Sequence, residues 1–518
     1  MSANAPRSGG KLRIGLDWEV DVIDPPASFG GWNTGRVVQQ MFESLVEDDL
    51  SDEASPVSRL IPALAEDFEV SADGRRYLFR LRQGVRFHDG TPFDAEAAKF
   101  NLERMWNPAA PQFSGVAADY NRIGVEAISE LRVRDMHELE VELKEPFPEF
   151  LRYMTQEDAP GAQVFISPTA LSKFGNDGIG DRAPGTGPFR FGRRFATDHG
   201  SGVDLVRNDD YWGGTPYLDG LQFVPLPDMD ERTRALVDGE IDLAYGLDGA
   251  DLAELADRGF VVRSGPVPYV WYFIFNMDDP YLSDRRVRHA IAHGFNRQRL
   301  SDTLFGGQTR PASGMLPPAS PSFDPDFEDP YLYDPEKARA LLAEAGVPGD
   351  WTLKITFAVA GSAQLRPLEI CRHLASDLGK VGLKVELAPH ADWIAYCNEW
   401  RSGMPGDIGM SEMSWGMSCD VWLDQVLHSR NLSPKGFNAG HFADPNVDNL
   451  LDRARTELNE EARIGLYRSA HARIMEELPV LPVVTVHSGT VVHHPRVRGF
   501  KYPKQNWHCF HRVWFSDN

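Results

Sequence analysis

The sequence predicts an α/β protein of two lobes joined by two strands, with an α+β domain inserted into the first lobe. Its length of 518 residues exceeds the roughly 250 to 300 residues at which a single core stops growing. Strand and helix patterns alternate over most of the chain, as in folds that pack helices on sheets. A stretch rich in hairpin patterns interrupts this alternation early in the chain, which predicts the inserted domain.

One aromatic run divides the chain into two alternating regions. Residues 269–275 are apolar, long enough for a buried strand and too short to span a membrane. An amphipathic helix follows, and we expect Arg285, Arg286 and Arg288 on its solvent face. We interpret the run as a strand that crosses between the lobes, and residues 480–486 as a second crossing strand.

The first lobe begins with a strand pattern at residues 11–18 and a helix pattern at 34–46. Between them lies a Pro/Gly-rich loop at the carboxyl end of the strand, where open α/β sheets place ligands. Trp32 in this loop is therefore a candidate ligand contact; alternatively, its ring only anchors the loop on the core. The alternation from residue 218 to 263 predicts a mainly parallel sheet.

Residues 51–167 show a different pattern of predicted helices and strands from the rest of the chain. A hairpin pattern surrounds the turn at 71–74, and Asp94 is placed to cap a helix that runs to Trp106. Strand patterns follow at 125–134 and 139–143. The predicted division is lobe I at 10–50 with 168–265 and 487–518, the inserted α+β domain at 51–167, and lobe II at 266–486.

Composition excludes several classes of protein. The formal charge of −23 argues against nucleic-acid binding, which requires a basic face. No apolar run is long enough for a transmembrane helix, and the first residues lack the apolar core of a signal peptide. The four cysteines allow three pairings, and their spacing matches no zinc pattern.

Five motifs, taken together, resemble one family. They are FRLRQGVRFHDGTPFDAEA at 79–97, GTGPF at 185–189, YWGGTPYLD at 211–219, VRHAI at 287–291 with Asn296 and Arg297, and DPEKARALLAEAG at 334–346. In this order they resemble the extracellular solute-binding proteins of dipeptide/oligopeptide-type ABC importers, cluster C, family 5. The resemblance implies a fold like that of the type II periplasmic binding proteins.

The resemblance also implies a function. We expect a monomeric periplasmic protein whose signal peptide is absent from this numbering, with neither catalytic residues nor a cofactor or metal. It would close its lobes on a small solute and present it to the permease subunits of the importer. The sequence contains no G-x-S-x-G elbow, H-E-x-x-H motif or P-loop.

The first group of candidate ligand contacts is Ser414, Trp415, Ser418 and Asp420. Small residues let a backbone approach the ligand and Trp415 offers a stacking face, unless it is a core plug. In the family's peptide binders an Asp of this segment pairs with the peptide's amino terminus. Here Ser418 occupies that place, and Asp420 lies two residues further on.

The loop at 358–366 departs from the peptide binders in a second way. Where they tend to carry an Arg for the peptide carboxylate, an ungapped comparison places Gly361, and Arg366 compensates only if the loop shifts. Desolvating an ammonium or carboxylate without a partner is costly. The sequence therefore makes a zwitterionic peptide a poor candidate ligand.

A second group of candidates is Asn438, Gly440 and His441, whose amide and imidazole groups suit hydroxyls or an anionic oxygen. The alternative is that Asn438 only closes a turn. On the crossing strand Tyr269 and Trp271 alternate with Val270 and Tyr272, so one pair should face the ligand. Asn506 and Trp507 in the tail complete the predicted site.

These features favour an opine, sugar or sugar-phosphate derivative as the ligand, and the family's agrocinopine-type binders are a specific possibility. Within the family the alternatives are an oligopeptide, nickel-chelate or heme binder. From other classes the alternatives are a hydrolase on the same fold and a chaperone-like protein that binds other proteins.

Overall fold

The structure is a computed structural model of the 518-residue chain. It describes residues 5–27, 31–55, 57–155, 163–247, 251–359, 361, 364–416, 419–486, 489–503 and 507–516. The chain divides into two compact units: the first is Met1–Gly265 with Gly489–Asn518, and the second is Pro266–Ser488. The separation of residues 51–167 as a domain of its own stays a prediction.

The elements of the first unit are, in chain order, β1 (Lys11–Leu16), η1 (Pro25–Ala27), α1 (Gly31–Met41), β2 (Val46–Asp48), β3 (Leu60–Pro62), β4 (Ala65–Val70), β5 (Arg76–Leu81), α2 (Ala95–Trp106), α3 (Gly115–Tyr120), α4 (Arg122–Glu126), β6 (Ile128–Asp135), β7 (Glu138–Leu143), α5 (Phe150–Tyr153), α6 (Pro168–Ile179), η2 (Gly180–Arg182), β8 (Phe189–Thr197), β9 (Gly200–Arg207), β10 (Gly220–Pro225), α7 (Met229–Val237), β11 (Leu243–Tyr245), α8 (Asp251–Asp257), β12 (Val261–Gly265), β19 (Gly489–His493), β20 (Val497–Arg498) and β21 (Trp514–Phe515).

The elements of the second unit are β13 (Tyr269–Phe275), α9 (Arg285–Gly294), α10 (Arg297–Leu304), β14 (Thr309–Pro311), α11 (Pro335–Ala345), β15 (Thr352–Ala358), α12 (Pro367–Lys380), β16 (Lys384–His390), α13 (Trp393–Ser402), β17 (Met410–Gly416), α14 (Val421–Leu427), η3 (Ser429–Asn431), α15 (Pro445–Thr456), α16 (Glu460–Glu477) and β18 (Val480–Val486).

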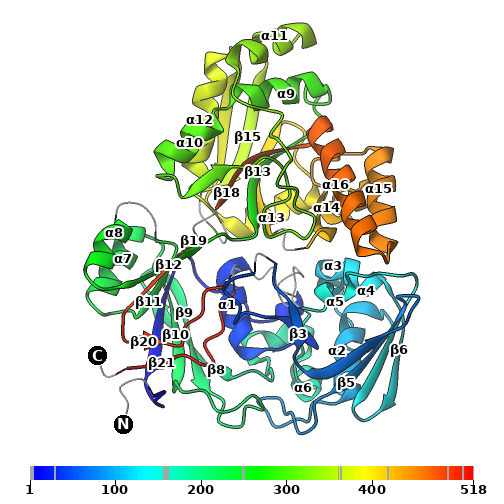
Figure 1. Cartoon of the computed structure of the whole chain (residues 1–518), viewed down its shortest axis with the longest axis vertical. Helices are drawn as coiled ribbons and strands as arrows, with labels where there is room; N and C mark the ends of the chain where they lie inside the picture. Colours follow the sequence, from blue (N-terminus) through cyan, green and yellow to red (C-terminus); the bar gives the residue numbers. More distant parts are fainter. Residues whose placement is uncertain are drawn as a thin grey trace. The chain divides into compact units, whose positions relative to one another are not determined.

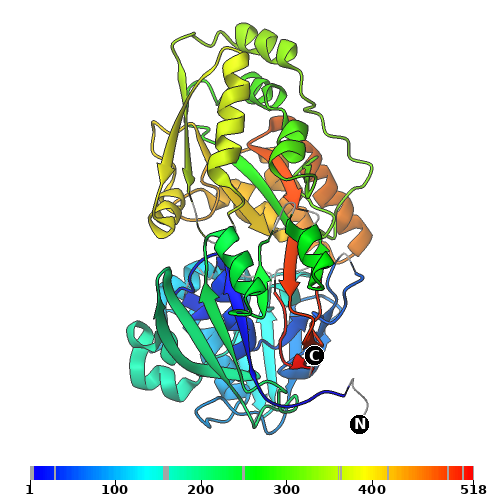
Figure 2. The same cartoon turned by 90° about the vertical axis from the view of Figure 1, so that its left-hand side faces the viewer.

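The main sheet of the first unit has the order β12-β19-β11-β1-β10-β9-β8. Only β10 and β11 pair with β1 in parallel; the other pairings are antiparallel. The expectation of a mainly parallel sheet is therefore wrong, because β8 and β9 form a hairpin and β19 enters the sheet against β11 and β12. Figure 2 shows β1 in blue beside the green strands of this sheet.

The predicted hairpin within 51–167 is confirmed as β4 and β5, in an antiparallel sheet of order β4-β5-β7-β6. The cap of α2 is also confirmed, since the Asp94 side chain accepts a hydrogen bond from the Ala97 N–H at 2.9 Å. The strand expected from residue 125 begins only at Ile128, because the short helix α4 occupies the preceding residues.

Helix α1 ends at Met41, five residues before the predicted end. The Gly187 N–H donates to the Met41 carbonyl at 2.9 Å, so a distant segment satisfies this end of the helix. A Cβ on Gly185 would lie 2.0 Å from the same carbonyl oxygen. The glycines of the GTGPF motif are therefore required by a close approach of two backbones.

The buried carboxyl group of Glu43 joins two of the motifs to the segment after α1. It accepts hydrogen bonds from the Thr186 hydroxyl at 2.7 Å, the Tyr211 hydroxyl at 2.7 Å and the Trp212 indole N–H at 3.0 Å. Burial raises the pKa of Glu43 to about 6, although these donors act in the opposite direction. These motif residues thus serve the fold of the first unit.

The sheet of the second unit has the order β14-β18-β13-β17-β15-β16. Strands β13 and β18 match the predicted ranges residue for residue and pair with each other antiparallel. Helices α9, α10, α11 and α12 gather together in this unit, and α15 packs along α16 (Figure 1). The chain passes between the units after β12 and again between β18 and β19.

Arg288 does not face solvent as predicted, since only 2% of it is exposed. Its guanidinium donates to the Leu478 carbonyl at 3.0 Å and to the Leu282 carbonyl at 2.7 Å. The last carbonyls of a helix lack partners within the helix, and Arg288 supplies donors just beyond the end of α16. Arg288 is thus buried rather than exposed, and its hydrogen bonds hold the end of α16.

Candidate functional site

Three predicted site residues lie at one end of the paired strands β13 and β17. The antiparallel register places Tyr269 opposite Gly416 and Trp271 opposite Ser414, so these side chains share one face. The rings of Tyr269 and Trp271 are 6.0 Å apart. Trp271 is 1% exposed whereas Tyr269 is half-buried, so Trp271 belongs to the core and Tyr269 to its margin.

Trp415, on the opposite face of β17, sits in an aromatic cluster. Its ring centroid lies 4.8 Å from that of Trp422, 5.3 Å from Trp400 and 5.4 Å from Phe437. These four residues, which we name the tryptophan cluster, come from β17, α13, α14 and the segment after η3. Trp415 is only 7% exposed, which is the packing expected of a core plug.

The tryptophan cluster also contains two unused hydrogen-bond donors. The indole N–H groups of Trp400 and Trp415 are buried and meet no acceptor among the residues that the structure describes. A buried N–H without an acceptor is costly and calls for an explanation. Aromatic planes combined with directed N–H donors are suited to a ring-shaped, oxygen-rich molecule.

On the opposite face of β13, the side chain of Tyr272 faces a small cavity. Tyr272 lines it together with Ile274, Phe437 and Asn438, and its volume is about 10 Å³, enough for one water molecule. The Tyr272 hydroxyl is buried and has no hydrogen-bond partner in the described ranges. A solute would not fit this cavity.

Asp420 is buried and engaged by the protein itself. Its carboxylate accepts hydrogen bonds from the hydroxyls of Ser320 and Ser322, both at 2.5 Å, and from the Ser322 N–H at 3.2 Å. Such charge-assisted bonds are strong. Asp420 therefore anchors the 320–322 segment at the start of α14, and Ser418 lies outside the described residues.

Asn438 closes a turn, as the alternative interpretation expected. Its side chain accepts from the Phe442 N–H at 3.1 Å and donates to the Phe442 carbonyl at 2.8 Å. The Gly440 carbonyl accepts from the Met277 N–H at 2.8 Å, and His441 Nδ1 lies 2.6 Å from Asp278 Oδ2. The three predicted contacts are thus brought together, by bonds that join this turn to the end of β13.

The loop before α12 shows how Gly361 and Arg366 are held. A Cβ on Gly361 would lie 2.6 Å from the Trp393 ring, so the ring leaves no room for a side chain there. Arg366 adopts a left-handed backbone with φ of 45° and donates to the Leu304 carbonyl at 3.4 Å. The guanidinium is thereby tied to the end of α10.

The remaining predicted residues belong to the first unit. Trp507 is 8% exposed, and its ring lies where a Cβ on Gly35 would come within 2.2 Å. The C-terminal tail is thus packed on α1. Trp32 lies in the first turn of α1, but its side chain and Asn506 fall outside what the structure describes.

The sequence did not predict one network of hydrogen-bonded polar side chains in the first unit. Asn33 donates to Asp17 Oδ1 at 2.9 Å, and Arg36 donates to Asn33 Oδ1 at 2.6 Å. The Arg36 guanidinium lies 3.8 Å from the centroid of the Tyr245 ring, and the Tyr245 hydroxyl is 2.9 Å from His508 Nδ1. Asp17 follows β1 and Tyr245 ends β11, which pair in parallel. The carboxyl ends of these two strands were the sequence signal that could have predicted this polar network.

His508 and His493 behave as core residues. Burial lowers the pKa of His508 to about 3, so its ring is neutral at pH 7 and stacks on Tyr502. Burial likewise lowers the pKa of His493 to about 4. Within the described ranges, no group of three or more His, Cys, Asp or Glu side chains is placed to hold a metal ion. The four cysteines are free thiols.

None of the helices in the described ranges combines the length and hydrophobicity needed to cross a membrane.

Residues 59–432 match the family model described as bacterial extracellular solute-binding proteins, family 5 Middle. Di/tripeptide-binding protein 2 of Pseudomonas aeruginosa is 30% identical over 440 residues, which cover 82% of this chain and 81% of that protein. Glutathione-binding protein GsiB of Salmonella paratyphi A is 31% identical over 443 residues, covering 84% of this chain and 82% of that protein.

Solved structures agree on the fold. The periplasmic binding protein DppA from Helicobacter pylori, in complex with the peptide STSA, matches with a TM-score of 0.86 and 23% identity over 99% of both chains. AgaA from A. tumefacien R10, in complex with agropinic acid, matches with a TM-score of 0.80 and 24% identity over 95% of both chains. The expected α/β binding-protein fold is thereby confirmed.

Proposed function

Because the chain belongs to the bacterial extracellular solute-binding proteins of family 5, which serve ABC importers, we propose that it captures a small polar solute in the periplasm and delivers it to the permease. The two units would close on the solute, and differential affinity for the closed form would drive that closure. The protein would act as a monomer.

The proposed solute is an opine, a sugar or a sugar-phosphate derivative. The observation that carries this proposal is the tryptophan cluster, with its two buried N–H groups that meet no acceptor in the described ranges. Sugar rings stack on aromatic planes, and their oxygens accept from indole N–H groups. The engagement of Asp420 by Ser320 and Ser322 supports the same choice, because a peptide ammonium would have to compete for that carboxylate.

A short peptide is the second candidate, since the two relatives above are named as di/tripeptide-binding and glutathione-binding proteins. A peptide needs partners for both of its charged ends. Asp420 and Arg366 already make hydrogen bonds within the protein, so a peptide would need other groups to pair with its charged ends.

Isothermal titration against a matched panel separates the two candidates. The panel contains agropinic and mannopinic acid, sugar phosphates, dipeptides and glutathione. We expect micromolar or tighter binding of at least one sugar-containing compound and no heat from dipeptides. Micromolar binding of ordinary dipeptides, with no binding of sugar derivatives, would overturn the choice of solute.

The proposal also states that the solute is not consumed. Family 5 members are binding proteins of transporters, so the solute should be recovered chemically unchanged. Native mass spectrometry of the purified protein, followed by release of the solute after prolonged incubation, measures this directly. A hydrolysed product that accumulates with time would favour the hydrolase alternative.

A further inference from the structure

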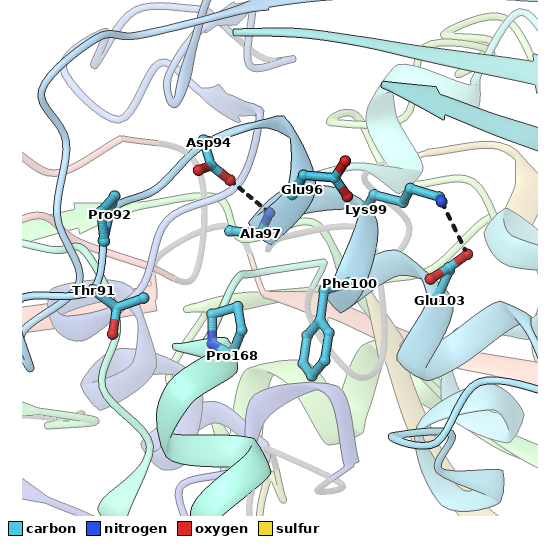
Figure 3. A pocket seen from close by; sticks show the side chains of 9 residues that line it. All are labelled: Thr91, Pro92, Asp94, Glu96, Ala97, Lys99, Phe100, Glu103 and Pro168. Carbon is cyan, nitrogen blue, oxygen red and sulfur yellow. Dashed lines mark hydrogen bonds and ion pairs between the residues drawn. The ribbon is translucent and has the colours of Figure 1, made fainter. Parts of the chain in front are cut away.

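A pocket of about 340 Å³ lies at the start of α2, within the first unit (Figure 3). Thr91, Pro92 and Asp94 of the preceding loop line one part of it, and Pro168, the first residue of α6, lines another. We name it the α2 pocket. Its lining belongs to the first unit, whereas the tryptophan cluster belongs to the second.

One face of α2 supplies the rest of the lining. Glu96, Lys99, Phe100 and Glu103 recur at helical spacing and so lie on the same side of the helix. Figure 3 shows the Phe100 ring beside Pro168, with the charged groups of Lys99 and Glu103 away from both. The α2 pocket therefore combines an apolar part with a charged rim.

The charges of the rim are mostly negative. Lys99 Nζ lies 3.6 Å from Glu103 Oε1, so these two charges offset each other. Asp94 uses one oxygen to cap the helix, and exposed Glu96 has no ion pair or side-chain hydrogen bond in the described part of the chain. The rim thus carries a net charge of two negative units and favours a positively charged partner.

The fold accounts for only some of the motif residues near the α2 pocket. Phe93, Ala95 and Ala97 are buried, and Asp94 caps the helix, so these residues serve folding. Pro92, which forms an isolated bridge with Arg86, and Glu96, in the first turn of α2, are exposed, and the Glu96 carboxylate makes no side-chain hydrogen bond or ion pair in the described ranges. They belong to the 79–97 motif that resembles the family signature, whereas the relatives are named for different solutes. A surface in this motif therefore fits a partner that family members share rather than a solute.

We propose that the α2 pocket receives an arginine-bearing loop of the importer's permease. Arginine fits better than lysine, because a planar guanidinium stacks on an aromatic ring and bonds a carboxylate with two N–H groups. Phe100 supplies the ring and Glu96 the carboxylate. This inference rests on the proposed function and adds to it a docking surface that lies wholly in the first unit.

The test is the stimulation of ATP hydrolysis by the importer, reconstituted in proteoliposomes, as a function of the concentration of the solute-loaded protein. We expect Glu96→Lys to raise the half-maximal concentration at least tenfold and Glu96→Gln to raise it less. Higher ionic strength should weaken docking of the wild type more than that of Glu96→Lys. Glu66→Lys is the matched control, because Glu66 is an exposed acid on β4 in the same unit, outside the pocket.

Solute affinity, measured by titration, should be equal in all four proteins. If Glu96→Lys stimulates the importer as the wild type does, or if Glu66→Lys is equally impaired, the inference is overturned while the proposed function stands. If the wild type stimulates no importer, both are overturned. Loss of solute binding in Glu96→Lys would also overturn the inference, since it would place Glu96 in the solute site or the fold.

Discussion

Ser322 donates a hydrogen bond of 2.5 Å from its hydroxyl to Asp420 Oδ2, and both residues are buried. The other oxygen of Asp420 accepts from Ser320 in the same way. Asp420 lies two residues along the chain from Ser418, which is expected to occupy the ammonium-binding position of the peptide binders, and its carboxylate is engaged within the protein. This contact makes a structural role for Asp420 testable.

Asp420→Ala should cost stability rather than affinity. The substitution leaves two buried serine hydroxyls without their acceptor. Because hydrogen bonds to a charged group are lost, the free energy of unfolding should fall by about 3 kcal/mol. Thermal unfolding should therefore occur at a lower temperature, while the folded variant keeps its solute affinity. Ser322→Ala, which removes one donor, should have a smaller effect. A large loss of affinity at unchanged stability would instead place Asp420 on the solute.

Glu412 should make stability fall as pH rises. Both of its carboxyl oxygens are buried and have no hydrogen-bond partner in the described ranges, and burial raises its pKa from 4.5 to about 8. The folded protein keeps this proton up to about pH 8, whereas the unfolded chain loses it above about pH 4.5. The penalty is absent well below pH 4.5, grows as pH rises and is complete above pH 8.

Glu412→Gln tests this sign, because the amide has the same shape and does not titrate. Its stability relative to the wild type should grow with pH and reach about 5 kcal/mol above pH 8, at about 1.4 kcal/mol for each pKa unit. Urea unfolding of both proteins between pH 4.5 and 8.5 measures the difference. A difference that does not change with pH would show that Glu412 keeps an ordinary pKa.

Two glycine substitutions should act in opposite directions. A Cβ on Gly187 would lie 2.7 Å from the backbone of Met41, so Gly187→Ala should destabilise the first unit by several kcal/mol. Gly465 lies within α16 with nothing within 4 Å of its Cβ position. Gly465→Ala should stabilise the protein by about 0.5 to 1 kcal/mol. Thermal unfolding of both variants measures these effects. Equal shifts in the unfolding temperature would contradict the close approach of Gly187 to Met41.

Trp415→Phe should weaken solute binding about tenfold, equivalent to about 1.4 kcal/mol. The phenyl ring retains an aromatic plane but removes the N–H donor that has no acceptor in the described ranges. Trp351→Phe is the matched control in the same unit, where Trp351 packs on Tyr281 at 5.2 Å. Titration with the solute measures both variants; equal affinities would assign the tryptophan cluster to the core alone.

Local signals in the sequence were sufficient for many elements. Strand β13 and the cap of α2 by Asp94 were predictable because each depends on a few neighbouring residues. The five motifs predicted the family for a similar reason, since they are short and keep their order along the chain.

Contacts between distant segments decided the rest. The end of α1 depends on Gly187, the burial of Arg288 on the end of α16, and the engagement of Asp420 on Ser320 and Ser322. The sequence alone predicted the elements and the family because backbone propensity and periodicity act over a few residues. Only the tertiary structure decided which polar groups remain available, because a hydrogen bond between residues a hundred positions apart leaves no local pattern.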